Sequence, residues 1–166
     1  NALDRADRMI ANLSTLAEAE TVVSDPEPVK IADIATDAWT TTETEAAELA
    51  VVAPDDWTVE CNPEFLQNIF ENLFRNSVTH NDSAVQIEVG LIDASESVGF
   101  YIEDDGTGIP DSEKSDVFDH GHTTSDEGTG LGLSIVSDLI EAHDWRISVS
   151  DSEAGGARFE IITADR

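Results

Sequence analysis

Asn68, Asn72 and Asn76 recur every four residues in a stretch that also carries many large apolar residues. On a helix this spacing places the three amides in one row along the same side. Asparagine is a mediocre helix former, so a row of three on a core helix needs a reason. One reason is a solvated polar face. The other is a ligand site, because a single amide oxygen can suffice for Mg2+, which keeps waters and substrate phosphates as its other ligands.

Asp104 is followed closely by Gly106 and Gly108, at the end of a stretch with the alternation of a strand. Glycines allow the backbone to approach a flat ligand closely. A carboxylate at a strand end can accept a hydrogen bond from an exocyclic amine such as that of adenine. An ordinary Asp-Gly turn explains the same residues, so this motif is only moderately specific.

Gly128, Gly130 and Gly132 surround the start of an apolar helix predicted over 131–142. A helix N-terminus exposes several backbone N–H donors, and the helix dipole favours an anion there. No lysine follows the last glycine, so the stretch differs from a Walker loop. Its chemistry is that of a phosphate cradle, and a tight turn is the alternative.

The elements that position these groups follow from hydrophobic periodicity and turn residues. Asn62 is predicted to cap the asparagine-bearing helix, with Pro63 in its first turn. A linker is predicted over 24–30, which contains two prolines, and the glycines at 155–156 predict a final hairpin. Helices are predicted over 3–21, 34–47 (capped by Asp33), 63–79 and 131–142, and strands over 49–53, 57–61, 85–92, 98–103, 147–149 and 157–163.

This order of elements predicts an α+β fold. We expect a two-layer α/β sandwich with a mixed, mostly antiparallel sheet covered on one face by helices and preceded by an N-terminal helix. The chain of 166 residues is long enough for one such domain. No apolar run is long enough to span a bilayer. The single cysteine, Cys61, cannot form an internal disulfide, and we expect a buried structural thiol in a reducing cytoplasm.

The charge of the chain is strongly negative, with 36 acidic residues against 8 lysines and arginines and a formal net charge of -28. Nucleic acid is an unsuitable partner, because phosphate binding needs a basic patch. Such self-repulsion is screened at molar salt, where the Debye length falls to about 3 Å. The composition therefore resembles the proteins of salt-in halophiles, particularly haloarchaea, and an acidic mesophilic protein is the alternative.

The three motifs also occur in a family-specific order. Asn72-x3-Asn76, then Asp104-x-Gly106-x-Gly108, then the glycine-rich stretch 128–133 resemble the N, G1 and G2 boxes of the ATP-binding domain of sensor histidine kinases. That domain belongs to the superfamily of gyrase, heat-shock-90 chaperones and mismatch-repair ATPases.

Val117-Phe118-Asp119 stands where the family has its F box, and the resemblance covers about residues 31–163. The first residues also resemble the second helix of the family's dimerisation and phosphotransfer hairpin. The resemblance thus implies a hairpin remnant over 1–23, a linker over 24–30 and a catalytic domain over 31–166.

The resemblance implies one role for each motif. Asn76 corresponds to the Mg2+ ligand, and Asn72 to its catalytic partner near the phosphates and the attacking group. Asp104 corresponds to the residue that binds the adenine amine. The remaining nucleotide-binding positions are implied at Gly106, Gly108 and Ile109 around the base, and at His80, Gly128, Thr129, Gly130, Leu131 and Gly132 near the phosphates, with a mobile lid over about 111–129.

The chain departs from the family in its basic residues. Thr79 stands where relatives often place a base, and the segment 122–125 lacks the lysine that some relatives have there. The phosphate charge would then be met by Mg2+, backbone amides and Arg75, His80 or His122, each of which also suits a surface or packing role.

The four histidines, His80, His120, His122 and His143, all fall within the ATP-binding part. His143 precedes an aspartate but ends a predicted helix, so a structural role is expected for it. The chain begins without a methionine, and we expect it to be a fragment whose phospho-acceptor histidine lies outside it.

The resemblance implies a histidine protein kinase. It would present the γ-phosphate of Mg-ATP to a histidine on a dimerisation helix outside this chain. The expected partners are that hairpin in a homodimeric parent and a response regulator, without nucleic acid and without direct membrane contact. The expected location is the cytoplasm, with a parent that can be membrane-anchored. The alternatives are a related ATPase or anti-sigma-type serine kinase, and a nucleotide-binding signalling adaptor.

Overall fold

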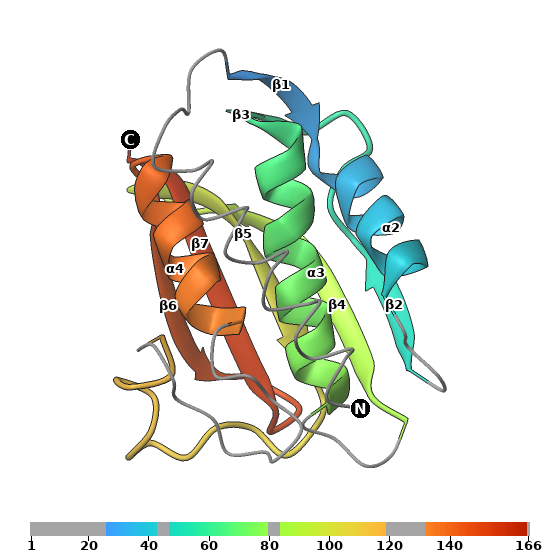
Figure 1. Ribbon diagram of the computed structural model, residues 1–166, viewed down its shortest axis with the longest axis vertical. Coiled ribbons are helices and arrows are strands. Elements are labelled where there is room, and N and C mark those ends of the chain that lie inside the picture. The colour runs from blue at the N-terminus through green and yellow to red at the C-terminus, as the bar shows by residue number, and fades with distance from the viewer. Residues whose placement is uncertain (1–25, 43–46, 80–83, 119–131, 166) are drawn as a thin grey trace, which may run out of the picture.

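In the computed structural model, the described residues are 26–42, 47–79, 84–118 and 132–165, and they form two layers. The helices α2 (Ile31–Thr41), α3 (Pro63–Thr79) and α4 (Gly132–Ala142) cover one face of a five-stranded sheet (Figure 1). The sheet has the strand order β2-β4-β5-β7-β6. Its strands are β2 (Glu48–Val51), β4 (Gln86–Asp93), β5 (Ser97–Asp104), β6 (Arg146–Asp151) and β7 (Ala157–Asp165).

The pairing confirms the predicted fold class. Strand β2 runs parallel to β4, whereas β4–β5, β5–β7 and β6–β7 are antiparallel, so the sheet is mixed and mostly antiparallel. The helix predicted over 3–21 lies outside the described residues. In the described part of the chain, no helix is long and apolar enough to cross a membrane.

Part of the segment predicted as a linker over 24–30 belongs to a second, two-stranded sheet. Residues Glu27–Lys30 form β1, which pairs antiparallel with β3 (Thr58–Cys61). The prolines favour a break in a local pattern, but Pro28 is tolerated here because β1 pairs along one edge only. The strands predicted over 49–53 and 57–61 therefore lie in different sheets, since β2 pairs with β4 and β3 pairs with β1.

Helix α3 begins and ends as predicted, whereas α2 is displaced. The side chain of Asn62 accepts hydrogen bonds from the backbone N–H groups of Glu64 (2.9 Å) and Phe65 (3.4 Å), which caps α3. Helix α2 spans Ile31–Thr41 instead of 34–47, and Asp33 lies in its first turn rather than at its cap. An acidic residue suits both places, because the helix dipole favours negative charge throughout the first turn.

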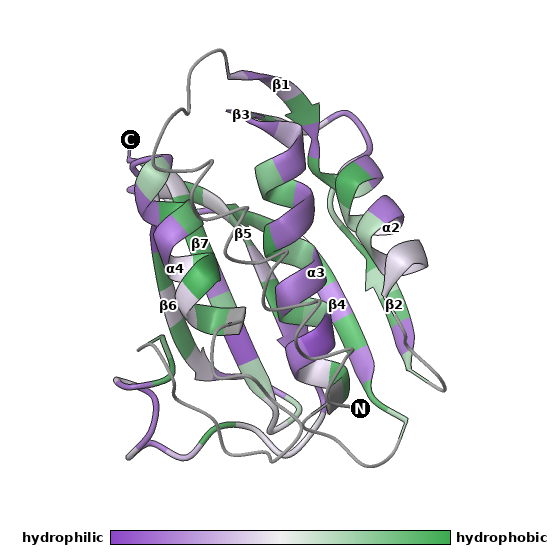
Figure 2. Ribbon diagram, viewed as in Figure 1, coloured by the Kyte–Doolittle hydropathy of each residue, from purple (hydrophilic) through white to green (hydrophobic). Residues whose placement is uncertain are grey.

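The core fills the space between the helices and the sheet. Helices α3 and α4 each carry both hydrophobic and hydrophilic residues along their length, as Figure 2 shows, which is typical of amphipathic helices. The largest fully buried side chains include Phe70 and Phe74 of α3 and Phe100 and Phe159 of the sheet. Each such burial contributes about 1.5–3 kcal/mol to stability.

Cys61 is fully buried, which confirms the predicted structural thiol. Burial, together with the nearby carboxylates of Glu27 and Glu60, raises the pKa of this thiol to about 12. Because the thiolate is the reactive form, the side chain is chemically inert in the folded protein.

Candidate functional site

Asp104 is the last residue of β5, and its side chain is only 6% exposed. Three donors converge on its carboxylate. The Ser77 hydroxyl of α3 donates to Oδ2 at 2.9 Å, and the backbone N–H groups of Gly106 and Ala157 donate to Oδ1 at 3.0 and 3.1 Å. All three donors are neutral, and no ion pair joins this carboxylate to a described residue.

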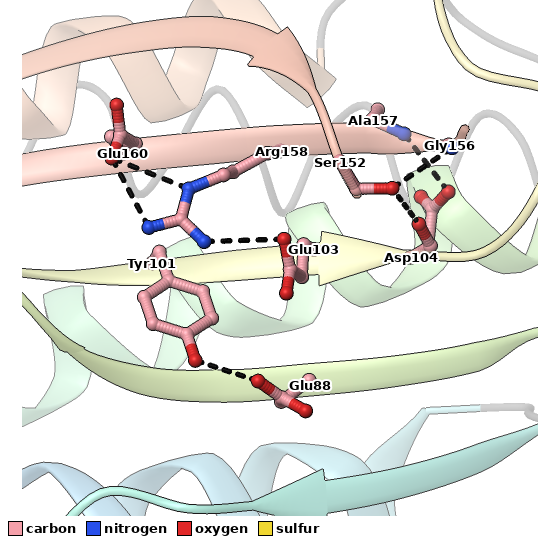
Figure 3. A network of polar contacts seen from close by, with 9 residues as sticks. All are labelled: Glu88, Tyr101, Glu103, Asp104, Ser152, Gly156, Ala157, Arg158 and Glu160. Carbon is pink, nitrogen blue, oxygen red and sulfur yellow. Dashed lines mark hydrogen bonds and ion pairs between the residues drawn. The ribbon is translucent and has the colours of Figure 1, made fainter. Parts of the chain in front are cut away.

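The hairpin between β6 and β7 holds the main chain of Asp104 in place (Figure 3). The Ser152 hydroxyl donates to the carbonyl oxygen of Asp104 at 2.7 Å and accepts from the N–H of Gly156 at 2.9 Å. A Cβ at Gly156 would lie 2.2 Å from that carbonyl oxygen and 2.3 Å from Oδ1. The close approach of the β6–β7 hairpin to the end of β5 therefore requires glycine at this position.

The turn after β5 packs onto the same hairpin. Gly108 adopts a φ of +75°, and a Cβ there would lie 2.9 Å from the carbonyl oxygen of Gly155. Ile109 is half-buried and packs against the hydrophobic core. The predicted base-binding residues Asp104, Gly106, Gly108 and Ile109 thus form one continuous turn.

Sequence reasoning missed Ser77, Ser152 and Gly156. The glycines at 155–156 are fully explained by the hairpin that they form, and no local pattern indicates that this hairpin reaches Asp104. The contact is tertiary, since Ser152 and Asp104 are 48 residues apart in the sequence.

The asparagine row of α3 contains an unsatisfied oxygen. The Asn72 amide nitrogen donates to the Asn68 carbonyl (2.8 Å) and to the Asn68 side-chain oxygen (2.6 Å), which fixes the orientation of the amide. Its other atom, Oδ1, is buried and has no hydrogen-bond partner among the described residues. An unsatisfied buried acceptor costs about 1–3 kcal/mol, so this oxygen suits a ligand that supplies positive charge or a donor. Asn76, one turn later, is half-buried.

The phosphate end of the predicted site is described only in part. Gly132 is the first residue of α4. His80, Gly128, Thr129, Gly130 and Leu131 lie outside the described residues. Most of the predicted lid lies there as well, as does Asp119 of the F box, whereas Val117 is buried in the described part.

His143 occupies a packed position. Its Nδ1 lies 2.8 Å from the Leu139 carbonyl oxygen, and its Nε2 accepts from the backbone N–H of Asn62 at 3.4 Å. The ring stacks on Trp145 with centroids 4.6 Å apart. Burial lowers the pKa of this imidazole, against the opposing effect of the Leu139 hydrogen bond. Both ring nitrogens are engaged, in keeping with a structural role.

The opposite face of the sheet bears a second polar network, which we call the outer network (Figure 3). The Arg158 guanidinium donates to Glu103 at 3.2 Å and to Glu160 at 3.3 Å, and lies 3.9 Å from the ring centroid of Tyr101. The Tyr101 hydroxyl donates to Glu88 at 2.6 Å. Gly90 leaves room for this ring, since a Cβ there would lie 2.4 Å from it.

Comparison with known proteins gives concordant matches. A profile of the family described as histidine kinase-, DNA gyrase B- and HSP90-like ATPases matches residues 61–166. The sensor histidine kinase CpxA of Escherichia coli (strain K12) is 32% identical over 106 residues, which are 60% of this chain and 23% of CpxA. The chain therefore spans about a quarter of the length of that relative.

Two solved structures share the fold. The mycobacterial sensor histidine kinase MprB has a TM-score of 0.73 at 23% identity, covering 84% of this chain and 99% of that one. The ATP binding domain of PrrB from Mycobacterium tuberculosis has a TM-score of 0.68 at 24% identity, covering 86% and 99%. Since the family profile covers more than half of the sequence, this chain belongs to the family of histidine kinase-, DNA gyrase B- and HSP90-like ATPases.

Proposed function

We propose that this domain binds Mg-ATP and is the catalytic ATP-binding part of a sensor histidine kinase. The observation that carries the proposal is the Asp104 carboxylate, which is buried, held by three neutral donors and not joined in an ion pair to any described residue. It stands in the second of three motifs whose order resembles that of sensor histidine kinases, and the matched relatives are named as such kinases.

The adenine end of the proposed site is the turn after β5. A carboxylate offers about four acceptor positions, and three donors occupy three of them here. The remaining position on Oδ2 can accept the exocyclic amine of adenine. Gly106 and Gly108 have no side chains, so the backbone can approach the base closely, and Ile109 supplies an apolar surface against the base.

The metal end of the proposed site is the asparagine row of α3. The donor set fits Mg2+, because neutral amide oxygens on a rigid helix can supply the one or two protein ligands that this ion needs. We assign Asn76 as the ligand and place Asn72, with its unsatisfied buried oxygen, beside the phosphates. When bound, Mg2+ neutralises charge on the transferring phosphoryl group. Gly132 begins α4, whose N-terminal N–H groups, with those of the residues 128–131, would hold the phosphates.

Phosphoryl transfer demands mainly positioning and charge neutralisation from a protein. In the proposed parent protein, the domain presents the γ-phosphate to a histidine on a dimerisation hairpin, and a response regulator then receives the phosphate. We assign residues 1–23 to a remnant of that hairpin. The proposal places the domain in the cytoplasm, where ATP is available.

The scarcity of bases near the phosphates favours a second candidate, a nucleotide-binding signalling adaptor without turnover. Thr79 ends α3 where many relatives place a basic residue. Mixing the chain with a separately prepared dimerisation hairpin and labelled ATP distinguishes the two, because only the kinase transfers the label to the histidine. A hairpin that stays unlabelled while the chain binds Mg-ATP favours the adaptor.

The adenine contact is tested by Asp104→Asn, with Glu103→Gln as a matched control. Each substitution removes one negative charge from the end of β5, but the two side chains lie on opposite faces of the sheet. We expect Asp104→Asn to weaken Mg-ATP binding at least about tenfold, because a donor replaces a buried acceptor, and Glu103→Gln to leave it unchanged. Calorimetric titration measures both, and equal effects of the two variants would refute the site.

The metal contact is tested by Asn76→Ala. The affinity of the wild type for ATP should rise when Mg2+ replaces a chelator, and the variant should lose most of that gain. Gln67→Ala, on another turn of the same helix, serves as a control that keeps the gain. An unchanged Mg2+ dependence in Asn76→Ala would remove this residue from the metal site.

We also propose that the domain is adapted to high salt, as in haloarchaea. With 36 acidic and 8 basic residues, the folded chain repels itself unless salt screens the charges. The unfolding temperature should therefore rise as potassium chloride is raised to molar concentration. A flat or falling dependence indicates an acidic protein without this adaptation.

A further inference from the structure

Ser77 directly follows the proposed metal ligand in α3, and its side chain is only 3% exposed. Its hydroxyl donates to Oδ2 of Asp104 at 2.9 Å. The other two donors to this carboxylate are backbone N–H groups, and both reach Oδ1. Among the described residues, Ser77 is therefore the side chain that fixes the second oxygen of the carboxylate.

The number of acceptor positions makes this contact important. Two N–H groups fill both positions on Oδ1, and the Ser77 hydroxyl fills one on Oδ2. The donors of the described residues therefore leave one acceptor position, on the oxygen that Ser77 orients. A neutral polar group that meets this oxygen has to donate a hydrogen bond to it, because an ionised carboxylate can only accept.

We propose that Ser77 is a specificity-determining residue, which orients Oδ2 of Asp104 so that the site accepts a 6-amino purine and rejects a 6-oxo purine. This inference rests on the proposed nucleotide function and deepens it. The amine of adenine donates to the free position. The carbonyl oxygen of a 6-oxo purine would meet the carboxylate oxygen with no proton between them, and such an unpaired buried contact is the strongest source of discrimination between similar ligands.

Loss of the Ser77 hydroxyl should relax this choice. The carboxylate would then be held at Oδ1 alone and could turn about its Cβ–Cγ bond. A second position on Oδ2 would also open to water, and a bridging water can donate to a carboxylate and to a carbonyl alike. Binding of the 6-amino base would weaken, while the penalty against the 6-oxo base would fall.

Ser152 provides a matched control. It is similarly buried, at 7% exposed, and its hydroxyl also contacts Asp104. That contact is to the main-chain oxygen, so it holds the strand end and leaves the carboxylate orientation to the other donors. Ser152→Ala should lower the unfolding temperature, because it leaves the Gly156 N–H and the Asp104 carbonyl without this partner. It should not change the preference between bases.

The experiment compares Mg-ATP with Mg-ITP, whose base carries a carbonyl at C6 and a proton on N1, by calorimetric titration of the full chain at high potassium chloride. The preference for ATP is the dissociation constant of Mg-ITP divided by that of Mg-ATP. We expect this ratio to fall about tenfold in Ser77→Ala. Ser77→Thr, which keeps the hydroxyl, should restore the ratio, and Ser152→Ala should leave it at the wild-type value. Thermal unfolding of each variant establishes that it is folded.

Two outcomes would overturn the inference in different ways. If the wild type prefers ATP and folded Ser77→Ala keeps the same ratio, the role of Ser77 is wrong while the nucleotide function stands. If the wild type binds neither nucleotide, the proposed function itself fails, and this inference fails with it.

Discussion

Glu103 and Asp104 are neighbours on β5, yet they belong to opposite environments because successive side chains of a strand point to opposite faces. Glu103 lies in the outer network, where it pairs with the Arg158 guanidinium at 3.2 Å. Asp104 lies on the inner face beneath α3, where its partners are one hydroxyl and two backbone N–H groups.

The two networks differ in completeness. In the outer network, a cation is shared by Glu103 and Glu160 and also covers the Tyr101 ring, so each charge has a protein partner. The side chains of Arg158 and Glu103 remain 26% and 20% exposed, and solvent limits the value of such pairs to about 1 kcal/mol or less. The inner network consists of Asp104 and its three donors, Ser77, Gly106 and Ala157. Among the described residues, no cation pairs with its carboxylate, and these donors leave one acceptor position open. A carboxylate paired with a cation stabilises the surface, whereas a carboxylate held only by neutral donors, with one acceptor position open, can receive a ligand.

The largest expected effect comes from Gly156→Ala. The new Cβ would lie 2.2 Å from the main-chain oxygen of Asp104, so the strand end has to shift. We expect a loss of about 1–3 kcal/mol in the free energy of unfolding, together with loss of detectable Mg-ATP binding. Denaturant unfolding and calorimetric titration measure the two effects.

Gly90→Ala is the matched control for that substitution. Its Cβ would meet the Tyr101 side chain at 2.4 Å, on the outer face. It should also destabilise the domain, but it should keep nucleotide binding. Equal losses of binding in both variants would mean that general destabilisation, and not the position of Asp104, explains the result.

A smaller effect is expected from Arg158→Met, which removes the cation of the outer network but keeps an apolar stem. The free energy of unfolding should fall by about 1 kcal/mol, because an ion-pair network and a cation–π contact are lost together. The affinity for Mg-ATP should not change. Urea unfolding provides the measurement.

Arg146→Met is the control, because it removes the more exposed ion pair between Arg146 and Asp165, whose side chains are 63% and 66% exposed. It should lower the free energy of unfolding less than Arg158→Met does.

The affinity for Mg-ATP is the second readout of Arg158→Met. If this variant weakens binding as strongly as Asp104→Asn does, the two faces of the sheet are coupled, and the distinction between the two networks no longer holds.

The smallest effect concerns the titration of Tyr101, the single tyrosine of the chain. Burial, followed by the hydrogen bond and charge of Glu88, raises the pKa of this phenol to about 12. The folded pKa exceeds the ordinary value of about 10, so the stability that it contributes is complete below pH 10 and is lost as the pH rises towards 12.

Ultraviolet titration of the phenolate measures this pKa directly. Glu88→Gln should lower the midpoint, although not to the ordinary value, because burial is the larger cause. A titration midpoint near pH 10 in the folded wild type would contradict the partial burial of Tyr101 and its hydrogen bond to Glu88.

Local patterns predicted the elements whose determinants are local. Helix α3 has a periodic apolar face, a capping Asn62 and a proline in its first turn, and it spans the predicted residues. The antiparallel pair β4–β5 was predictable from alternation. Strand β1 was not predictable from its local sequence, because its prolines favour a break. It forms a strand because it pairs with β3, through partners such as Val29 and Val59.

The sequence by itself determined the identity and order of the motif residues, including Asn72, Asn76 and Asp104, since these depend on residue types and short spacings. Only the tertiary structure decided how Asp104 is held. Its partners Ser77, Ser152 and Ala157 come from α3 and from the β6–β7 hairpin, 27, 48 and 53 residues away along the chain. Hydrogen bonding and steric exclusion act over about 3 Å. Such contacts therefore depend on which distant segments the fold brings together, and no spacing in the sequence encodes them.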